Sequence, residues 1–391
     1  MTTLTRPAGG SPRSGALSAP RNGPPFDVLL VAATLLVSCI GVVMVYTATR
    51  GTLLAAGDDP KTFLKKQGFF MVLGVIGMVA VAVFDYRRLE PVAHVLYGMV
   101  VLSLLGVFVV GSSAQGAARW FSLGFIQLQP SEFAVLAVIL AVAASCARRS
   151  EEGLAWRDII RILIMAGIPI GLVLVQPDLG TAMITVIVLL VMLTVAGVPL
   201  RILVLLLVGA MVVALIAVEG GLLHAYQIAR LTTFLHPGES STNVYVKGAI
   251  NNIAQAKNAI GSGGMFGSGI GRGAQTNLGY VPEQQTDFIF TAVGEQLGFV
   301  GSALVIALQG VIAWRILRAA MVARDVFGRL ICSGLFAFFA FSVFQNAGMT
   351  MGIMPITGIP LPFMSYGGTA VLVFYAAIGL TLSVGARRRY R

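Results

Sequence analysis

The acidic residues that precede one long apolar stretch are the strongest candidates for chemistry in this chain. Residues 279–301 read GYVPEQQTDFIFTAVGEQLGFVG, with Glu283, Thr286 and Asp287 in the polar half and an apolar helical pattern in the other half. If this stretch enters a membrane, Asp287 lies about where the water ends. A carboxylate at such a boundary can be partly desolvated and used as a general base. Asp287 is therefore the predicted catalytic residue.

Three further acids fall in or beside apolar stretches, where charges are costly and often functional. Glu132 lies near the start of one stretch, Asp178 lies between two stretches, and Glu295 follows Asp287 by eight residues. On a continuous helix, positions 287 and 295 would lie about 12 Å apart on nearly one face, so both could line one groove. The simpler alternatives are that Asp178 is the N-cap of the next helix and that Glu132 has a capping role near Ser131.

Composition identifies a polytopic membrane protein. Of the 391 residues, 57% are hydrophobic and 11% are charged, and the mean hydropathy is +0.88, which excludes a water-soluble globule of this length. Crossing about 30 Å of hydrocarbon takes about 20 apolar residues. We predict an all-α integral membrane protein with ten transmembrane helices at 27–49, 66–84, 91–111, 129–146, 160–176, 179–197, 201–218, 289–317, 329–350 and 366–385. The fifth holds Pro169, so the fifth and sixth could instead be one broken helix.

The distribution of Lys and Arg predicts the orientation. With a cytoplasmic N-terminus, 18 of the 27 basic residues lie in inner segments and five in short outer ones. Residues 1–26 then form a disordered cytoplasmic tail, 27–386 the membrane domain, and 387–391 a basic cytoplasmic end. The net charge of +11 reflects this bias and attraction to anionic lipid, so no nucleic-acid partner is expected.

One long extracellular loop, at 219–288 between spans seven and eight, stands out among short connections. Loops of that length are usually functional or disordered, and its many apolar residues favour order. A helical period at 246–260 predicts a short helix on the membrane surface, with Val246, Ile250, Ile253, Lys257 and Ile260 on one face. This helix could contact substrate or simply pack on the bundle.

Two irregular segments follow. Residues 261–273 read GSGGMFGSGIGRG; a dinucleotide site is excluded because no strand precedes the glycines, which leaves a tight turn or a nest of amides for an anionic headgroup. Residues 355–368, PITGIPLPFMSYGG, place three prolines at membrane depth, which is tolerable only where the backbone is buried in protein or lines a wet cavity. We expect the segment to help wall a cavity. His224 and His236 lack cysteine partners, so a zinc site is not expected.

Four blocks in order resemble the SEDS family (RodA, FtsW and SpoVE) of cell-wall polymerases: GAARWFSLGFIQLQPSEFAVLA at 116–137, QPDLGTA at 176–182, the 279–301 block, and NAGMTMGIMPITGIPLPFMSYGGT at 346–369. The match covers nearly the whole chain after residue 26. PITGIPLPF is more similar to RodA, the elongation member, than to FtsW, the division member.

The resemblance implies a peptidoglycan glycosyltransferase that polymerises lipid II during cell elongation, on the outer face of the bacterial cytoplasmic membrane, with a class B penicillin-binding protein as partner. Asp287 matches the family's essential loop aspartate. It would take the proton of the acceptor 4-hydroxyl as that oxygen displaces undecaprenyl pyrophosphate from the donor with inversion. A divalent cation, Mg²⁺ or Mn²⁺, fits this chemistry, with no ligand cluster to identify its site. The substrate-binding candidates are Arg119, Glu132, Asp178, Arg230, Lys247, Arg272, Glu283, Thr286, Glu295 and Ser365.

The chain departs from the family pattern at two positions. Val135 stands where family members usually carry a Lys that pairs with the acid three residues earlier, so either another cation compensates Glu132 or Glu132 is protonated. Ala118 replaces a second common basic residue beside Arg119. Two other functions stay open. A lipid II flippase would depend on Glu132, Asp178 and Glu295 and would tolerate the loss of Asp287. A non-catalytic scaffold for a penicillin-binding protein would tolerate the loss of all four acids.

The charge bias yields a prediction about topology. A cysteine placed at Ser150 should be protected from an impermeant thiol reagent in intact cells, because the 147–159 connection is predicted to be cytoplasmic. A cysteine placed in the 219–288 loop should be labelled. Labelling at position 150 in intact cells would contradict the orientation.

Overall fold

The computed structural model describes residues 26–114, 117–123, 126–148, 154–220, 225–235 and 243–387. Residues 1–25 of the predicted N-terminal tail and the C-terminal residues beyond 387 lie outside this described part, as do Ser150, His224 and His236.

Each of the ten predicted spans is a helix in the structure. Among the described residues, eight helices are long and apolar enough to cross a membrane, whereas α6 and the apolar part of α7 are shorter. The protein is therefore a multi-pass helical membrane protein. Pro169 lies inside α5, and α5 and α6 are two separate helices rather than one broken helix. The long helices are α1 (Val28–Ala56), α2 (Thr62–Val83), α3 (Leu89–Val110), α4 (Pro130–Ala147), α5 (Trp156–Val175), α6 (Leu179–Val195), α7 (Leu200–Glu219), α11 (Ile289–Val322), α12 (Val326–Met351) and α13 (Gly368–Ala386).

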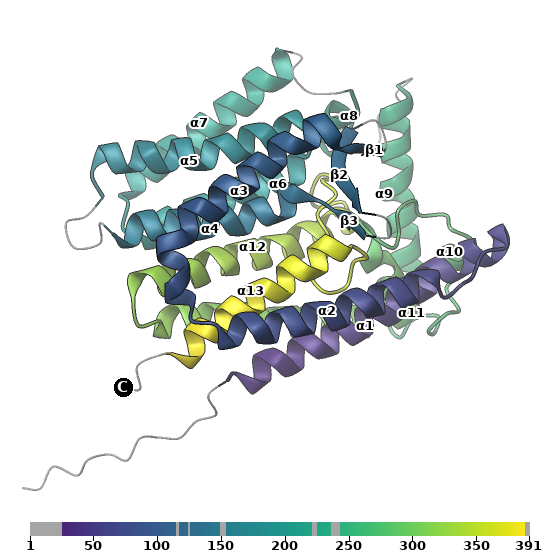
Figure 1. Cartoon of the computed structure of the whole chain (residues 1–391). Helices are drawn as coiled ribbons and strands as arrows, with labels where there is room; N and C mark the ends of the chain where they lie inside the picture. The colour runs from purple at the N-terminus through teal and green to yellow at the C-terminus, as the bar shows by residue number, and fades with distance from the viewer. Residues whose placement is uncertain are drawn as a thin grey trace, which may run out of the picture.

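The two ends of the described chain lie at the same end of the bundle (Figure 1). The opposite end carries a small antiparallel sheet, which the sequence analysis did not foresee, and three further helices. The sheet has the order β1-β2-β3, and Phe121 of β2 pairs with Leu128 of β3. These elements are β1 (Ser112–Ala114), β2 (Ala117–Leu123), β3 (Ile126–Leu128), α8 (Ala225–Leu235), α9 (Val244–Ser262) and α10 (Ala274–Asn277), while the 3-10 helix η1 (Tyr86–Arg88) joins α2 to α3.

Helix α9 confirms the helix predicted within the long loop, but it packs through smaller residues than expected. Ala249, Ala256 and Ala259 are buried against a cluster formed by α11, α12 and their flanking segments, whereas Lys257 is exposed. Alanine faces allow close helix approach, so the helix is tied to the bundle at the end where Asp287 lies.

The longest helix, α11, is broken at Gly298, which has a φ of 68°. A side chain there would collide with the main chain of Met265 and Gly267. The glycine-rich loop replaces the hydrogen bonds that the break removes. The Ser268 and Gly269 amides donate to the carbonyls of 295 and 296, and the amides of 299 and 300 donate to the carbonyls of 264 and 265.

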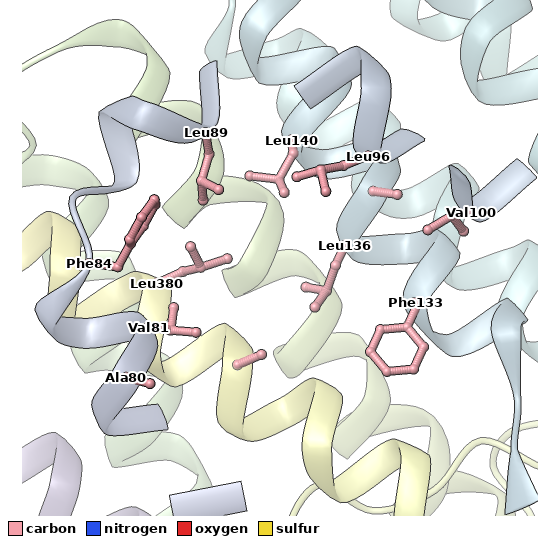
Figure 2. Close-up of a pocket in the computed structure, with 12 residues that line it drawn as sticks. Ala80, Val81, Phe84, Leu89, Leu96, Val100, Phe133, Leu136, Leu140 and Leu380 are labelled. Atoms are coloured by element: carbon pink, nitrogen blue, oxygen red, sulfur yellow. The ribbon is translucent and has the colours of Figure 1, made fainter. Parts of the chain in front are cut away.

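An apolar cavity of about 440 Å³ lies between α2, α3, α4 and α13. Figure 2 shows its lining, which includes Phe84, Leu96, Phe133 and Leu136 and consists of apolar side chains throughout. Such a wall offers no group that could recognise a sugar or a phosphate. The site must therefore be sought at the end of the bundle that carries the polar motifs.

Candidate functional site

The segment just before α11 is fixed through three successive main-chain carbonyls. The carbonyls of residues 285–287 accept, in chain order, the Tyr366 amide at 2.8 Å, the Ser365 hydroxyl at 2.6 Å and the Asn346 side-chain amide at 2.8 Å. The donors come from the end of α12 and from the segment between α12 and α13. Asp287 is thereby held against the C-terminal third of the chain.

The proline-rich segment that supplies two of these donors is buried in protein. Its carbonyls lack helical partners, and long side chains on neighbouring helices satisfy them instead. Gln345 donates to the Pro355 carbonyl, Asn346 to the Ile359 carbonyl and Gln309 to the Pro362 carbonyl, each at 2.8 Å. Of the two predicted settings for this backbone, burial in protein is the one found over residues 355–365.

Asp287 and Arg230 approach each other across Gly358. A Cβ built on Gly358 would lie 3.3 Å from Asp287 Oδ2 and 3.8 Å from Arg230 Nη1, so the two charged groups are no farther apart than the sum of these distances. Gly358 has a φ of 75°, a conformation that side chains rarely adopt. Glycine therefore fits the backbone conformation here and places no side chain between the carboxylate and the guanidinium.

Helix α8 positions Arg230 from the other side. The guanidinium lies over the Tyr226 ring, 5.6 Å from its centre, and the Tyr226 hydroxyl donates to the Pro177 carbonyl at 2.8 Å. Pro177 and Gly180 both belong to the QPDLGTA block. A side chain would not fit at Gly180, because a Cβ there would lie 2.8 Å from the Thr357 carbonyl oxygen. The block therefore supports both α8 and the buried segment that faces Asp287.

Asp178 is a helix N-cap, which confirms the simpler of its two predicted roles. Its Oδ1 accepts the Thr181 amide at 3.1 Å, and its Oδ2 accepts the hydroxyls of Thr181 and Ser131 at 2.8 and 3.1 Å. The Gln129 side-chain amide donates to the same oxygen at 3.2 Å. The carboxylate thus joins the start of α6 to the start of α4, and this bonding accounts for its place at membrane depth.

Glu132 lies beside this cluster, and its Oε2 atom is buried without a hydrogen-bond partner. Val135 is 1% exposed and belongs to the main core. No ion pair within the described residues involves Glu132, so the compensating cation is not found there. The protonated alternative stays a prediction.

The prediction that Asp287 and Glu295 line one groove is wrong. Asp287 precedes the helix, which begins at Ile289, so the helical spacing does not apply. Glu295 is 1% exposed. Its carboxylate accepts the amides of Gln275 and Thr276 at 2.7 and 2.9 Å and the Thr276 hydroxyl at 2.5 Å. Glu295 therefore anchors α10 to α11 and does not face the Asp287 site.

The glycine-rich loop is not a free nest of amides. Gly263 and Gly267 touch the carbonyl oxygens of Gly294 and Gln296 so closely that a Cβ at either position would lie 2.0 or 2.1 Å away. The amides that could face an anion donate to α11 instead, including Gly271 to the Gln296 side chain at 2.8 Å. The tight-turn alternative is the one the structure supports, because these glycines are needed for close main-chain contact.

The remaining candidates lie around this end of the bundle. Glu283, Lys247 and Arg272 are exposed, and the Glu283 carboxylate accepts the Gln285 amide at 3.3 Å. Arg119 lies on β2, and its side chain is outside the described part of the structure. Of the predicted cationic residues, Arg230 is thus the one whose described side chain lies near Asp287.

Ser365 and Thr286 act on the backbone rather than as free binding groups. Besides donating to the Thr286 carbonyl, the Ser365 hydroxyl accepts the Leu361 amide at 2.8 Å, and its side chain is buried. The Thr286 hydroxyl donates to the Glu283 carbonyl at 3.1 Å. Both residues therefore shape the Asp287 segment, and the predicted direct substrate contact has no support from their geometry.

Asn346 and Gly358 were missed from the sequence. A signal for Asn346 was present, because an amide in an apolar helix must find partners or destabilise the fold. Gly358 gave no such signal. Its role depends on which side chains meet across it in space.

Replacing Asn346 by Leu should destabilise the protein, because the carbonyls of Asp287 and Ile359 would lose their donor. Each buried group left unpaired costs about 1–3 kcal/mol. The measurement is the Tm of the purified protein in detergent, with Asn258→Leu on the exposed face of α9 as the matched control. Equal Tm values for the two variants would show that this clamp contributes little.

Comparisons with known proteins agree with the fold and the motifs. A family model described as Cell cycle protein, for FtsW, RodA and SpoVE, matches residues 27–390. The chain is 36% identical over 370 residues to Stage V sporulation protein E of Bacillus subtilis, covering 93% of this chain and 98% of that protein. It is 36% identical over 340 residues to Peptidoglycan glycosyltransferase MrdB of Escherichia coli K12, covering 86% and 88%.

Solved structures give the same result. The Thermus thermophilus rod shape determining protein RodA superimposes with a TM-score of 0.69 at 29% identity, covering 94% of this chain and 98% of that chain. A chain of a structure described as "Structural coordination of polymerization and crosslinking by a peptidoglycan synthase complex" gives a TM-score of 0.75 at 29% identity, covering 92% and 97%. The chain therefore belongs to the FtsW/RodA/SpoVE family, the SEDS family that its motifs resemble, whose members include proteins named as peptidoglycan glycosyltransferases.

Proposed function

We propose that this protein is a peptidoglycan glycosyltransferase that polymerises lipid II on the outer face of the bacterial cytoplasmic membrane. Family membership and the names of its relatives support the reaction class. The observation that carries the residue assignment is the meeting of Asp287 and Arg230 across Gly358. A base and a cation within reach of one small space are what attack by a hydroxyl on a pyrophosphate-linked sugar requires.

In this mechanism Asp287 acts as the general base. It takes the proton of the acceptor 4-hydroxyl while that oxygen forms a bond to C1 of the donor sugar. The bond from C1 to the pyrophosphate oxygen breaks on the opposite face, so the configuration inverts and undecaprenyl pyrophosphate leaves. The hydrogen bonds to the carbonyls of residues 285–287 fix the base before substrate arrives, which lowers the cost of orienting it in the transition state.

The leaving pyrophosphate needs positive charge nearby. Arg230 is the described cation that meets Asp287 across Gly358, while Lys247 on α9 and Arg272 just before α10 are exposed. No cluster of three or more potential metal ligands occurs within the described residues. Mg²⁺ is often held by one or two carboxylates together with substrate phosphates, and the exposed Glu283 carboxylate could be one such ligand while Asp287 stays free to act as the base. When bound, it would neutralise charge on the leaving group.

The excess of Lys and Arg in the connections on the side of the N-terminus supports a cytoplasmic location for both termini. The two ends of the described chain lie at the same end of the bundle, which agrees with an even number of membrane crossings. The elongation role rests on the local likeness of PITGIPLPF to RodA. Overall identity is equal for the sporulation protein and MrdB, so it does not rank the alternatives. The alternative function as a lipid II flippase is less well supported, because the carboxylates of Asp178 and Glu295 accept hydrogen bonds within the fold.

Asp287→Asn should lower glycan polymerisation by about 10²–10⁴-fold, because the amide keeps the shape of the side chain but cannot accept the proton. Purified protein and lipid II provide the assay, and an unchanged Tm would establish that the variant is folded. Asp59→Asn in the exposed α1–α2 connection is the control and should polymerise normally. Wild-type polymerisation rates in Asp287→Asn would show that the general-base assignment is wrong.

A class B penicillin-binding protein is the proposed partner, because no S-x-x-K transpeptidase motif is recognisable in this sequence and glycan strands need cross-links. An apolar groove of about 360 Å³ between α11 and α12 supports docking of the partner's transmembrane helix, and Gly310 lies in it. Other small residues on α11 and α12 are less suited to such a contact. Gly298 and Ala337 are buried within the fold, and a Cβ at Gly301 would lie 2.2 Å from Leu297 Cβ.

Gly310→Leu should weaken co-purification with the penicillin-binding protein, because it fills the groove, while a Cβ at this position would have no atom of the described residues within 4 Å apart from its own helix backbone and chain neighbours. Gly77→Leu on α2, an equally open glycine, is the control and should leave the complex intact. If Gly310→Leu retains the partner as well as Gly77→Leu does, the interface lies on another face of the bundle.

A further inference from the structure

The loop that joins α9 to α10 exposes large apolar side chains at the end of the bundle that carries Asp287. Phe266 is 80% exposed, and Met265 and Ile270 are each 59% exposed. A surface loop in water would not normally gather three such residues within six positions. These three residues are called the apolar tip below.

The apolar tip is continuous with the lipid-facing surface of a transmembrane helix. The Val300 amide donates to the Met265 carbonyl at 3.1 Å and the Phe299 amide to the Gly264 carbonyl at 2.9 Å. Phe299 is 65% exposed and Leu304 is 57% exposed, as expected for a span whose outer surface faces hydrocarbon. The apolar tip therefore adjoins the exposed apolar surface of α11.

The charges around the apolar tip suit a membrane interface. No charged residue occurs between Lys257 and Arg272, and both of these cations are exposed. Basic residues that flank an apolar segment favour its insertion, because they reach anionic headgroups while the apolar side chains enter the hydrocarbon.

The backbone of the loop is also prepared for a dry environment. The amides of Gly267, Ser268 and Gly269 and the carbonyls of Gly264 and Met265 have partners within the protein. Unpaired backbone groups are costly in lipid, so a loop that satisfies them internally can lie at the hydrocarbon boundary. These five backbone groups therefore need no water as a hydrogen-bond partner.

We infer that Met265, Phe266 and Ile270 insert into the bilayer leaflet on the Asp287 side, next to α11, so that the glycine-rich loop is a lipid-binding surface. The occupant is lipid hydrocarbon, with Lys257 and Arg272 at the level of the headgroups. The inference does not depend on the reaction proposed above.

Spin-label accessibility in reconstituted protein tests this insertion. Full-length protein with Cys39→Ala, which removes the exposed native thiol, would carry a nitroxide on Phe266→Cys in phosphatidylethanolamine and phosphatidylglycerol vesicles. Met265→Cys provides a second position in case the first variant does not fold. Leu304→Cys is the lipid reference and Asp58→Cys, in the exposed α1–α2 connection, is the water reference.

The measured quantity is the ratio of collision with oxygen, which concentrates in hydrocarbon, to collision with a water-soluble nickel complex. We expect the ratio at the tip to lie on the Leu304 side of the midpoint between the two references. A ratio on the Asp58 side would overturn the inference, and the exposed tip would then be a surface for a protein partner instead.

Discussion

Hydrogen bonds from buried side-chain amides are the interaction on which the site depends. Three prolines keep residues 355–365 from forming a helix, and this segment nevertheless lies inside the protein. It can do so because Gln309, Gln345 and Asn346 supply donors to its carbonyls. Asn346 and the end of this segment then bind the carbonyls of 285–287. Without these amides, neither Gly358 nor Asp287 would have a fixed position, since unpaired carbonyls at this depth are costly.

Composition and hydropathy were sufficient for the architecture. Long apolar stretches can only be helices in lipid, because every backbone group must be satisfied within its own segment. The ten predicted spans therefore became helices. The small sheet at 112–128 was not foreseen, because its strands are short and lie at the bundle end, where water and neighbouring elements compete with local preference.

Residue type and position made Asp287 the leading candidate, but helical spacing gave a wrong prediction for its neighbours. The predicted alignment with Glu295 assumed a continuous helix, whereas α11 starts two residues after Asp287 and breaks again at Gly298. Glycine made this break possible, and the loop that fills it comes from about 30 positions earlier in the sequence. Contacts of this kind cannot be derived from a helical period, because they depend on tertiary packing.

The most direct measurement of the central claim is a cryo-electron microscopy structure of the protein with a non-reactive lipid II analogue as acceptor. The account predicts that an Asp287 carboxylate oxygen lies about 2.6–3.2 Å from the acceptor 4-hydroxyl, the reach of a general base, with Arg230 on the same side of the sugar. An acceptor sugar bound away from Asp287, with its hydroxyl nearer to Glu132 or to no acid at all, would contradict it.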